Sequence, residues 1–238
     1  MSPAPSPPSL GERFERAVAA ALAVHRGRRG TPAGVPYVAH LFGVCAIVLE
    51  NGGSESEAIA ALLHRTVEEN GRSEQLAAIR TAYGDDVGDI VAGCSDTADE
   101  PPGEPRRRFY DRTLALIERL RRLPTGGGPG GTASGVFLVS AADTLYDARA
   151  TSDELSRGTD VFAPTAGKKF GALWAYRALA DAYRKREGRH APFADALVEL
   201  VDAMAGKPVT AAALLAAFAV DATVERREKG SLLAEGAP

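Results

Sequence analysis

The chain contains 238 residues, carries a formal net charge of −3 and is 45% hydrophobic. A chain of this length and apolar content can bury one large core, alone or with a small appendage. The slight acidity gives no reason to expect nucleic acid as a partner, since proteins that bind nucleic acids concentrate positive charge.

The sequence also indicates a compartment. Only two cysteines occur, Cys45 and Cys94, and both lie in apolar helical patterns, which is typical of a reducing environment without a disulfide framework. The first residues lack the basic segment and apolar run of a secretory signal. The longest apolar stretch, near 210–220, is too short to span a bilayer. We therefore expect a cytoplasmic protein with no membrane partner.

Helical periodicity dominates the chain after a proline-rich start. Residues 1–9 predict a disordered tail. The first helix is indicated by residues that recur at three- and four-residue spacing, namely Phe14, Val18, Ala21, Leu22 and His25. Further helices are predicted over 37–50, 55–69, 74–83, 86–95, 106–122, 136–155, 168–186 and 191–204. The fold class expected is all-α, with a helical domain over 10–204 and a C-terminal helical extension and tail over 205–238.

The helix predicted over 55–69 carries the first candidate chemistry. Ser54 and Glu57 have the spacing of a capping box, which fixes where this helix begins. His64 and Glu68 lie four residues apart and would share one helical face. Taken alone, the charges here could equally be a solvated helix end with surface salt bridges.

Two other segments favour a functional role for His64 over a solvated helix end. His40 lies in the first turn of the preceding helix, and Asp143 follows an apolar helical run, where an unpartnered carboxylate is costly to bury. Together with His64 these side chains would form an imidazole–carboxylate cluster that suits Mn, Fe or a similar divalent ion. The alternative for Asp143 is a structural salt bridge between helices.

The segments HRGRRGTPAGVPYVAH, EAIAALLHRTVEEN and FLVSAADTLYDARA, in this order, resemble the HD hydrolase domain of RelA/SpoT-type proteins. The resemblance is closest to the small stand-alone versions, which hydrolyse the 3′-pyrophosphate of guanosine tetraphosphate. It implies an HD-type helical bundle over 10–204. It also implies metal ligands at His40, His64 and Asp143, a water-orienting pair at Glu68 and Glu69, and ligand-binding residues at Arg28, Arg29, Tyr37, Asp147 and Tyr176.

The chain departs from this family pattern at the site itself. Arg65 stands where the family has the metal-binding aspartate of its His-Asp pair, and arginine stays protonated and cannot ligate a cation. The other departures fall at family lysine or asparagine positions and are Phe109, Thr144 and Asp147. We therefore expect a degenerate site without a cofactor, with Mn or another divalent metal as the alternative.

Three hypotheses of function remain open. The first is a repurposed, metal-independent enzyme, for which specialised biosynthesis is one setting, in which His64 or Glu68 is the acid or base and Arg65 stabilises negative charge. The second is a residual metal-dependent phosphohydrolase of a guanosine tetraphosphate-like nucleotide. The third is a non-catalytic, ligand-binding regulatory protein. All three expect a small, phosphorylated or otherwise anionic ligand, and all are compatible with a homo-oligomer.

Overall fold

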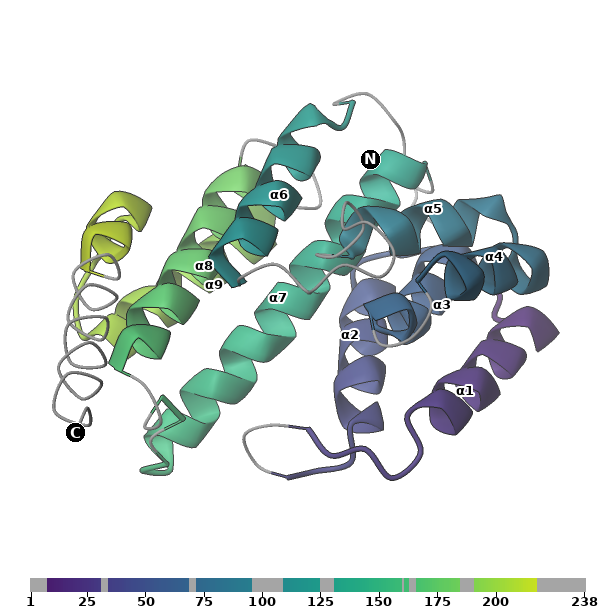
Figure 1. Cartoon of the computed structure of the whole chain (residues 1–238), viewed down its shortest axis with the longest axis horizontal. Helices are drawn as coiled ribbons and strands as arrows, with labels where there is room; N and C mark the ends of the chain where they lie inside the picture. The colour runs from purple at the N-terminus through teal and green to yellow at the C-terminus, as the bar shows by residue number, and fades with distance from the viewer. Residues whose placement is uncertain are drawn as a thin grey trace, which may run out of the picture.

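Helices form the regular structure of the chain, as the periodicity predicts (Figure 1). The structure is a computed structural model, and it describes residues 8–30, 34–68, 72–95, 109–124, 131–159, 161–162, 166–184 and 191–217. Within these ranges no residue belongs to a named strand, and one isolated β-bridge joins Arg29 to Pro36. The all-α fold class is confirmed.

The helices follow one another closely along the chain. In order they are α1 (Glu12–Val24), α2 (Val38–Glu50), α3 (Glu55–Leu63), the short 3₁₀ helix η1 (Thr66–Glu68), α4 (Arg72–Tyr83), α5 (Asp85–Cys94), α6 (Phe109–Arg122), α7 (Thr132–Ser156), α8 (Ala166–Arg184) and α9 (Ala191–Ala205).

Helix α7 runs through the middle of the molecule and joins its two sides (Figure 1). It packs against α2, α3 and α5 on one side and against α8 and α9 on the other, while α6 packs on α8. Its segment 134–142 is buried throughout, because it is covered from both sides. An Asp at the end of that segment is therefore carried into the interior between the two groups of helices.

One hydrophobic core spans both sides of α7. Its fully buried large side chains come from helices across the chain and include Leu41, Ile59, Leu62, Ile90, Phe137, Leu138, Leu173 and Leu197. The predicted apolar face of α1 contributes Ala21 to this core, but Leu22 is 44% exposed and does not belong to it. A side chain one position further along a helix is turned by about 100°, which carries Leu22 out of the buried face.

Helix α3 begins where the capping box predicts. The hydroxyl of Ser54 accepts a hydrogen bond from the Glu57 backbone N–H, and the Glu57 carboxylate accepts one from the Ser54 backbone N–H at 2.7 Å. These two bonds satisfy backbone donors that a helix start leaves without a helical partner. They fix the first turn of the helix that leads to His64.

The far end of this helix differs from the prediction. We expected one helix over 55–69, but α3 ends at Leu63 and the chain turns before η1. The ring Nδ1 of His64 lies 2.7 Å from the carbonyl of Ala61, one of the carbonyls left over at the helix end. His64 and Glu68 therefore do not share a face of one α-helix, and that step of the sequence argument is wrong.

Several predicted segments lie outside the described residues. Among them are residues 1–7 of the expected tail and 218–238 of the expected C-terminal extension. The described part of that extension contains a helical segment over 211–217, and Leu214 there is buried in the core. A search of the described helices finds none with the length and apolar character needed to cross a bilayer.

Candidate metal centre

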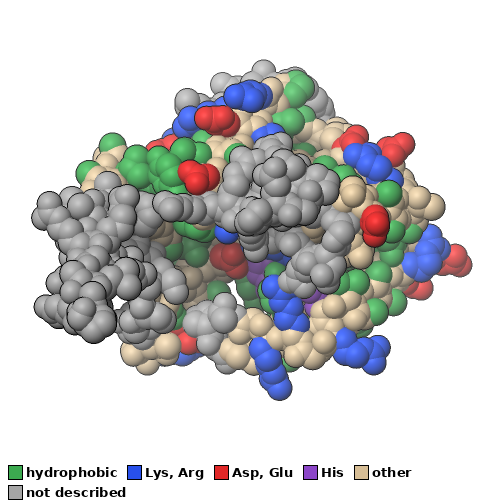
Figure 2. All heavy atoms as spheres, in the orientation of Figure 1, with side chains coloured by type: hydrophobic (Ala, Val, Ile, Leu, Met, Phe, Trp, Pro, Cys, Tyr) green, Lys and Arg blue, Asp and Glu red, His purple; other side chains and the backbone are tan. Residues whose placement is uncertain are grey.

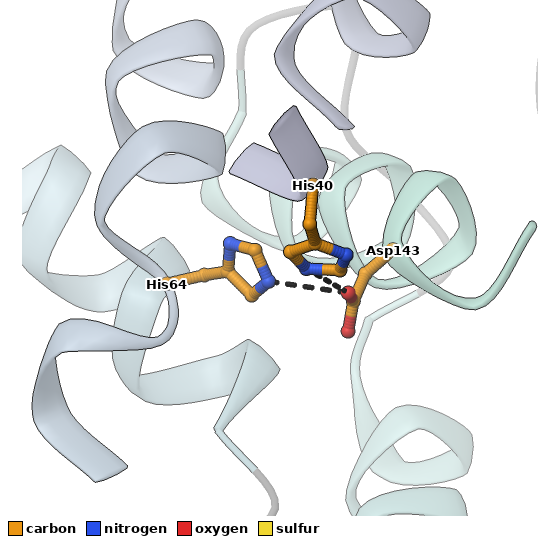
Figure 3. Close-up of side chains that lie close together, drawn as sticks. All are labelled: His40, His64 and Asp143. Carbon is orange, nitrogen blue, oxygen red and sulfur yellow. Dashed lines mark ion pairs between the residues drawn. The ribbon is translucent and has the colours of Figure 1, made fainter. Parts of the chain in front are cut away.

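Three side chains from different parts of the chain meet beside α7. His40 comes from the first turn of α2, His64 directly follows α3, and Asp143 comes from the middle of α7 (Figure 3). One ligand atom from each lies within 4.8 Å of the other two. The Nε2 atoms of His40 and His64 lie 3.1 Å and 3.2 Å from the same oxygen, Oδ1 of Asp143.

Contacts on the outer edge of each ring orient both imidazoles. The Nδ1 of His64 faces the Ala61 carbonyl at 2.7 Å, and the Nδ1 of His40 faces Oδ1 of Asp147 at 3.2 Å. In each case the partner is an acceptor, so the Nδ1 atom is assigned as the donor. The lone pair of a neutral ring is then on Nε2, which is the arrangement that metal-binding histidines adopt.

The inner edges of the rings match this assignment. Both Nε2 atoms are buried and neither makes a well-aligned hydrogen bond with any described residue, although both lie close to Asp143. Two imidazole nitrogens and one carboxylate directed at one point are a ligand set that suits a divalent transition metal with open coordination positions. The residues present therefore fit a metal ion.

The charges around the cluster stabilise one another. Burial would raise the pKa of Asp143, but Arg65, His64 and His40 hold it well below its usual range. Burial would lower the pKa of His40, but the carboxylates of Asp143 and Asp147 outweigh this and raise it to about 9. With Asp143 ionised, the cluster has an anionic ligand at its centre.

Arg65 points into this cluster. Its Nη2 lies 2.9 Å and 3.2 Å from the two carboxylate oxygens of Asp143 and 3.5 Å from Oδ2 of Asp147. Its side chain is 22% exposed. Because α3 ends at Leu63, the direction of Arg65 is set by the turn that follows and not by a helical register.

The two arginines of the predicted basic pair, Arg28 and Arg29, lie in different surroundings. The backbone of the loop that carries it folds back, with the Tyr37 N–H donating to the Arg28 carbonyl at 3.0 Å. The guanidinium of Arg28 then lies 4.0 Å from the centre of the Tyr37 ring, and that ring stacks on His40 with centroids 5.4 Å apart. Arg29 instead donates to the Gly34 carbonyl within its own exposed loop.

The remaining predicted residues lie at different distances from the cluster. Asp147 is part of it through His40 and Arg65. The hydroxyl of Tyr176 lies 3.3 Å from Thr151 Oγ1, and burial together with the charge of Asp147 raises the pKa of Tyr176. The side chain of Glu68 and all of Glu69 lie outside the described residues.

Two further positions, where the resemblance leads one to expect lysine, carry uncharged side chains in this protein. Thr144 is buried and its hydroxyl lies 2.8 Å from the Ser140 carbonyl and 3.0 Å from the hydroxyl of Tyr183. Phe109 is 48% exposed at the start of α6. Neither position supplies a cation to the site.

Sequence reasoning missed two residues beside the cluster. The Tyr146 ring packs edge-on against His40 at 5.1 Å, and the ring of buried His25 lies 5.0 Å from that of Tyr37. Both left a signal, because Tyr146 is three residues after Asp143 on one helical face and His25 ends the apolar pattern of α1.

The centre opens to solvent on one face. In Figure 2 histidine side chains are visible on this face, next to acidic and basic side chains and partly behind residues outside the described ranges. The exposed fractions of the Asp143 and Asp147 side chains, 20% and 43%, increase outward from the ligands in agreement with that view. A ligand could therefore reach the cluster from this side.

Two histidines and an aspartate from separate segments of an all-helical bundle form a ligand set that suits a divalent metal ion. Comparison with protein families matches residues 17–170 to the family described as HD domain. The chain belongs to the HD domain family.

Individual proteins of known activity are also similar to this chain. A guanosine-3′,5′-bis(diphosphate) 3′-pyrophosphohydrolase of Xenopus tropicalis is 34% identical over 124 residues, which cover 51% of this chain and 59% of that protein. The Homo sapiens counterpart is 32% identical over 138 residues, with 57% of this chain and 67% of that protein covered. The match thus spans less than two thirds of the Xenopus relative.

A solved structure supports the fold. It is described as a metazoan ortholog of SpoT that hydrolyzes ppGpp and plays a role in starvation responses, and its TM-score with this chain is 0.60 at 20% identity. The superposition covers 80% of this chain and 96% of that one. The prediction of a RelA/SpoT-type HD domain is confirmed.

The prediction of a site without a cofactor is wrong. His40, His64 and Asp143 keep a compact ligand set that suits a divalent metal ion, in a chain of the HD domain family whose similar proteins are named as pyrophosphohydrolases. The expectation of a metal-free site rested on Arg65 standing where the family has an anionic ligand. The structure shows that the other three ligands still converge, with Arg65 paired to Asp143 and close to Asp147.

Proposed function

We propose that this protein is a metal-dependent phosphohydrolase that acts on a guanosine 3′,5′-bis(diphosphate)-like nucleotide. The observation that carries the proposal is the convergence of His40, His64 and Asp143, with both Nε2 atoms directed at the carboxylate. The family membership and the printed activities of the relatives support the choice of substrate class.

The chain's own residues suit such a reaction. His40, His64 and Asp143 would hold the ion, which supplies Lewis-acid stabilisation of negative charge on a phosphoryl group. Asp147 and the Ala61 carbonyl accept from Nδ1 of the two rings, which leaves Nε2 of each ring as the atom that would bind the ion in exchange for any proton it carries. Arg28, held over the Tyr37 ring, provides a guanidinium beside the centre, and guanidinium groups bind phosphate oxygens in a bidentate manner.

The metal-independent, repurposed enzyme is the weaker hypothesis. It required the ligand set to be disabled, but the three ligands and the groups that orient them are in place. It also offered Glu68 as an alternative to His64 for the acid or base, and the side chain of Glu68 lies outside the described residues. A role in specialised biosynthesis has no support from the site.

The test is release of pyrophosphate from guanosine tetraphosphate by purified protein, with and without added Mn²⁺. We expect release that depends on Mn²⁺ and that falls by about 100-fold or more in Asp143→Asn, because this change removes the anionic ligand. The matched control is Asp153→Asn, which alters an exposed carboxylate on the same helix and should leave the rate unchanged.

Other outcomes point elsewhere. Binding of the nucleotide without hydrolysis would favour the regulatory hypothesis, and equal rates with and without metal would favour the repurposed enzyme. A cytoplasmic location and self-association stay predictions, which fractionation of cells and light scattering of the purified protein would test.

A further inference from the structure

Arg65 lies between two carboxylates that differ in their relation to the metal ligands. Its Nη2 is 2.9 Å from Oδ2 of Asp143 and 3.5 Å from Oδ2 of Asp147. These two aspartates are one helical turn apart and share a face of α7. The guanidinium therefore has two neighbouring anionic partners within reach of a small side-chain movement.

Only one of these partners belongs to the ligand set. Asp143 offers a ligand atom together with His40 and His64. Asp147 turns Oδ1 to the outer edge of the His40 ring and Oδ2 to Arg65, and at 43% exposure it is the outer of the two carboxylates. A cation that binds the three ligands competes with Arg65 for Asp143 but not for Asp147.

The charges make this competition direct. Arg65 donates to both oxygens of Asp143, so a metal ion that takes this carboxylate meets a fixed positive charge a few ångströms away. Arginine cannot lose its proton to relieve the repulsion. This repulsion favours a shift of the guanidinium away from Asp143, and the nearest described carboxylate besides Asp143 is the one it already approaches, that of Asp147.

We propose that Arg65 is an internal competitor for the metal, which bonds Asp143 in the metal-free protein and is retained by Asp147 when the ion binds. Arg65 and Asp147 then act as a pair, and both differ from the residues that the resemblance leads one to expect at these positions. The inference rests on the metal centre of the proposed function. Arg65 acts here as a positioning residue, because it controls the carboxylate through which the ion is held.

The pairing has two consequences. The metal-free protein keeps a compensated Asp143 without any cation from solution, and the affinity for metal is lower than three ligands alone would give. Removal of Arg65 should therefore strengthen metal binding. Removal of the charge on Asp147 should weaken it, and more strongly while Arg65 is present.

The experiment is a calorimetric titration of Mn²⁺ into four metal-free proteins: the wild type, Arg65→Gln, Asp147→Asn and the double variant. Asn at 147 keeps an oxygen that can accept from His40 Nδ1, so it removes mainly the charge that attracts Arg65. The matched control is Arg157→Gln. This change breaks an ion pair of similar length, 3.0 Å, between Arg157, which follows the last residue of α7, and Glu154 of α7.

We expect Arg65→Gln to bind Mn²⁺ about tenfold or more tightly than the wild type, in line with the weight of groups that contact metal ligands. Asp147→Asn should weaken binding about tenfold in the wild type but only a few-fold in the Arg65→Gln background, a coupling between neighbours that the cycle isolates. Arg157→Gln should bind as the wild type does.

A second measurement covers variants that fold less well. At one Mn²⁺ concentration the rise in the unfolding midpoint on adding metal should be larger for Arg65→Gln than for the wild type, because tighter binding stabilises the folded state more. This readout compares each protein with its own metal-free form, so a change in basal stability does not obscure it.

The outcomes separate the two proposals. Equal or weaker Mn²⁺ binding by Arg65→Gln, or an equal effect of Asp147→Asn in both backgrounds, would overturn the role of Arg65 and leave the metal centre intact. If neither the wild type nor Arg65→Gln binds Mn²⁺, the metal centre fails, and with it both this inference and the proposed function.

Discussion

At the scale of single residues, His25 is a buried imidazole whose environment differs from those of His40 and His64. It is 2% exposed, its Nδ1 lies 3.5 Å from Nη1 of Arg28, and its Nε2 has no hydrogen-bond partner among the described residues. Burial, with the charge of Arg28, lowers the pKa of His25 to about 4. The folded protein therefore keeps this ring neutral behind Tyr37.

This shift predicts a pH dependence of stability. Between the ordinary histidine pKa of 6.5 and about 4, the unfolded chain takes up the proton more readily at His25 than the folded chain does. The free energy of unfolding should thus fall as the pH drops through this window. His25→Phe keeps a ring without the titration and should remove about 2 kcal/mol of that loss between pH 7 and pH 4.5.

Urea unfolding of both proteins at several pH values measures the effect. The contributions of His40 and of the carboxylates are common to the two proteins, so the difference between the two curves isolates His25. Parallel curves over the whole range would show that the buried ring does not resist protonation.

The direction of Arg65 shows which residue-level features could be predicted. His40, His64 and Asp143 were identifiable because their residue types and order carry the family resemblance. The direction of Arg65 was not, since it depends on α3 ending at Leu63, where the His64 ring takes up the Ala61 carbonyl. A hydrogen bond between a side chain and a backbone carbonyl within the same turn leaves no periodic signal in the sequence.

At the scale of elements, the site depends on how closely α2 approaches α7. Gly43 lies on α2 one turn after His40, and a Cβ atom built on it would overlap the Tyr146 ring of α7. The same ring packs edge-on against His40. The absence of a side chain at Gly43 thus sets the spacing that brings His40 to Asp143.

Gly43→Ala should therefore destabilise the protein and weaken metal binding together. We expect a loss of about 1–3 kcal/mol from overpacking, despite a gain of about 1 kcal/mol in helix preference over glycine. The loss of metal affinity follows because Tyr146 or α2 must shift beside His40. Urea unfolding and Mn²⁺ titration measure the two effects.

The control is Gly88→Ala in α5. The three atoms nearest to a Cβ built there all belong to the partly exposed side chain of Arg80, which would have to shift. This variant should lose some stability, because Arg80 is paired with Asp85 and Asp89, but it should keep its metal affinity. If Gly43→Ala behaves in the same way, the close approach of α2 to α7 is not what holds His40 in place.

The positions of helices were more predictable than the contacts between them. The capping box at Ser54 and Glu57 located the start of α3, because it is a local signal of fixed spacing. The predicted helix over 136–155 was found as Thr132–Ser156, four residues longer at its start. The approach at Gly43 joins elements about a hundred residues apart, and no local pattern encodes it.

At the scale of the whole molecule, the proposed metal centre depends on α7. It supplies Asp143 and Asp147, while its two flanks pack against helices from both halves of the chain. Helical periodicity alone predicted an all-α protein. That His40 and His64 should meet on α7 came from the family resemblance, because periodicity does not say which helices become neighbours.

The central claim is that His40, His64 and Asp143 hold one divalent ion. The measurement that tests it most directly is anomalous diffraction at the manganese edge from crystals of the protein grown with Mn²⁺. The account predicts a single strong peak within bonding distance of both Nε2 atoms and the Asp143 carboxylate, with Arg65 turned to Asp147. A map without a peak at these atoms at saturating Mn²⁺, with Arg65 still paired to Asp143, would contradict it.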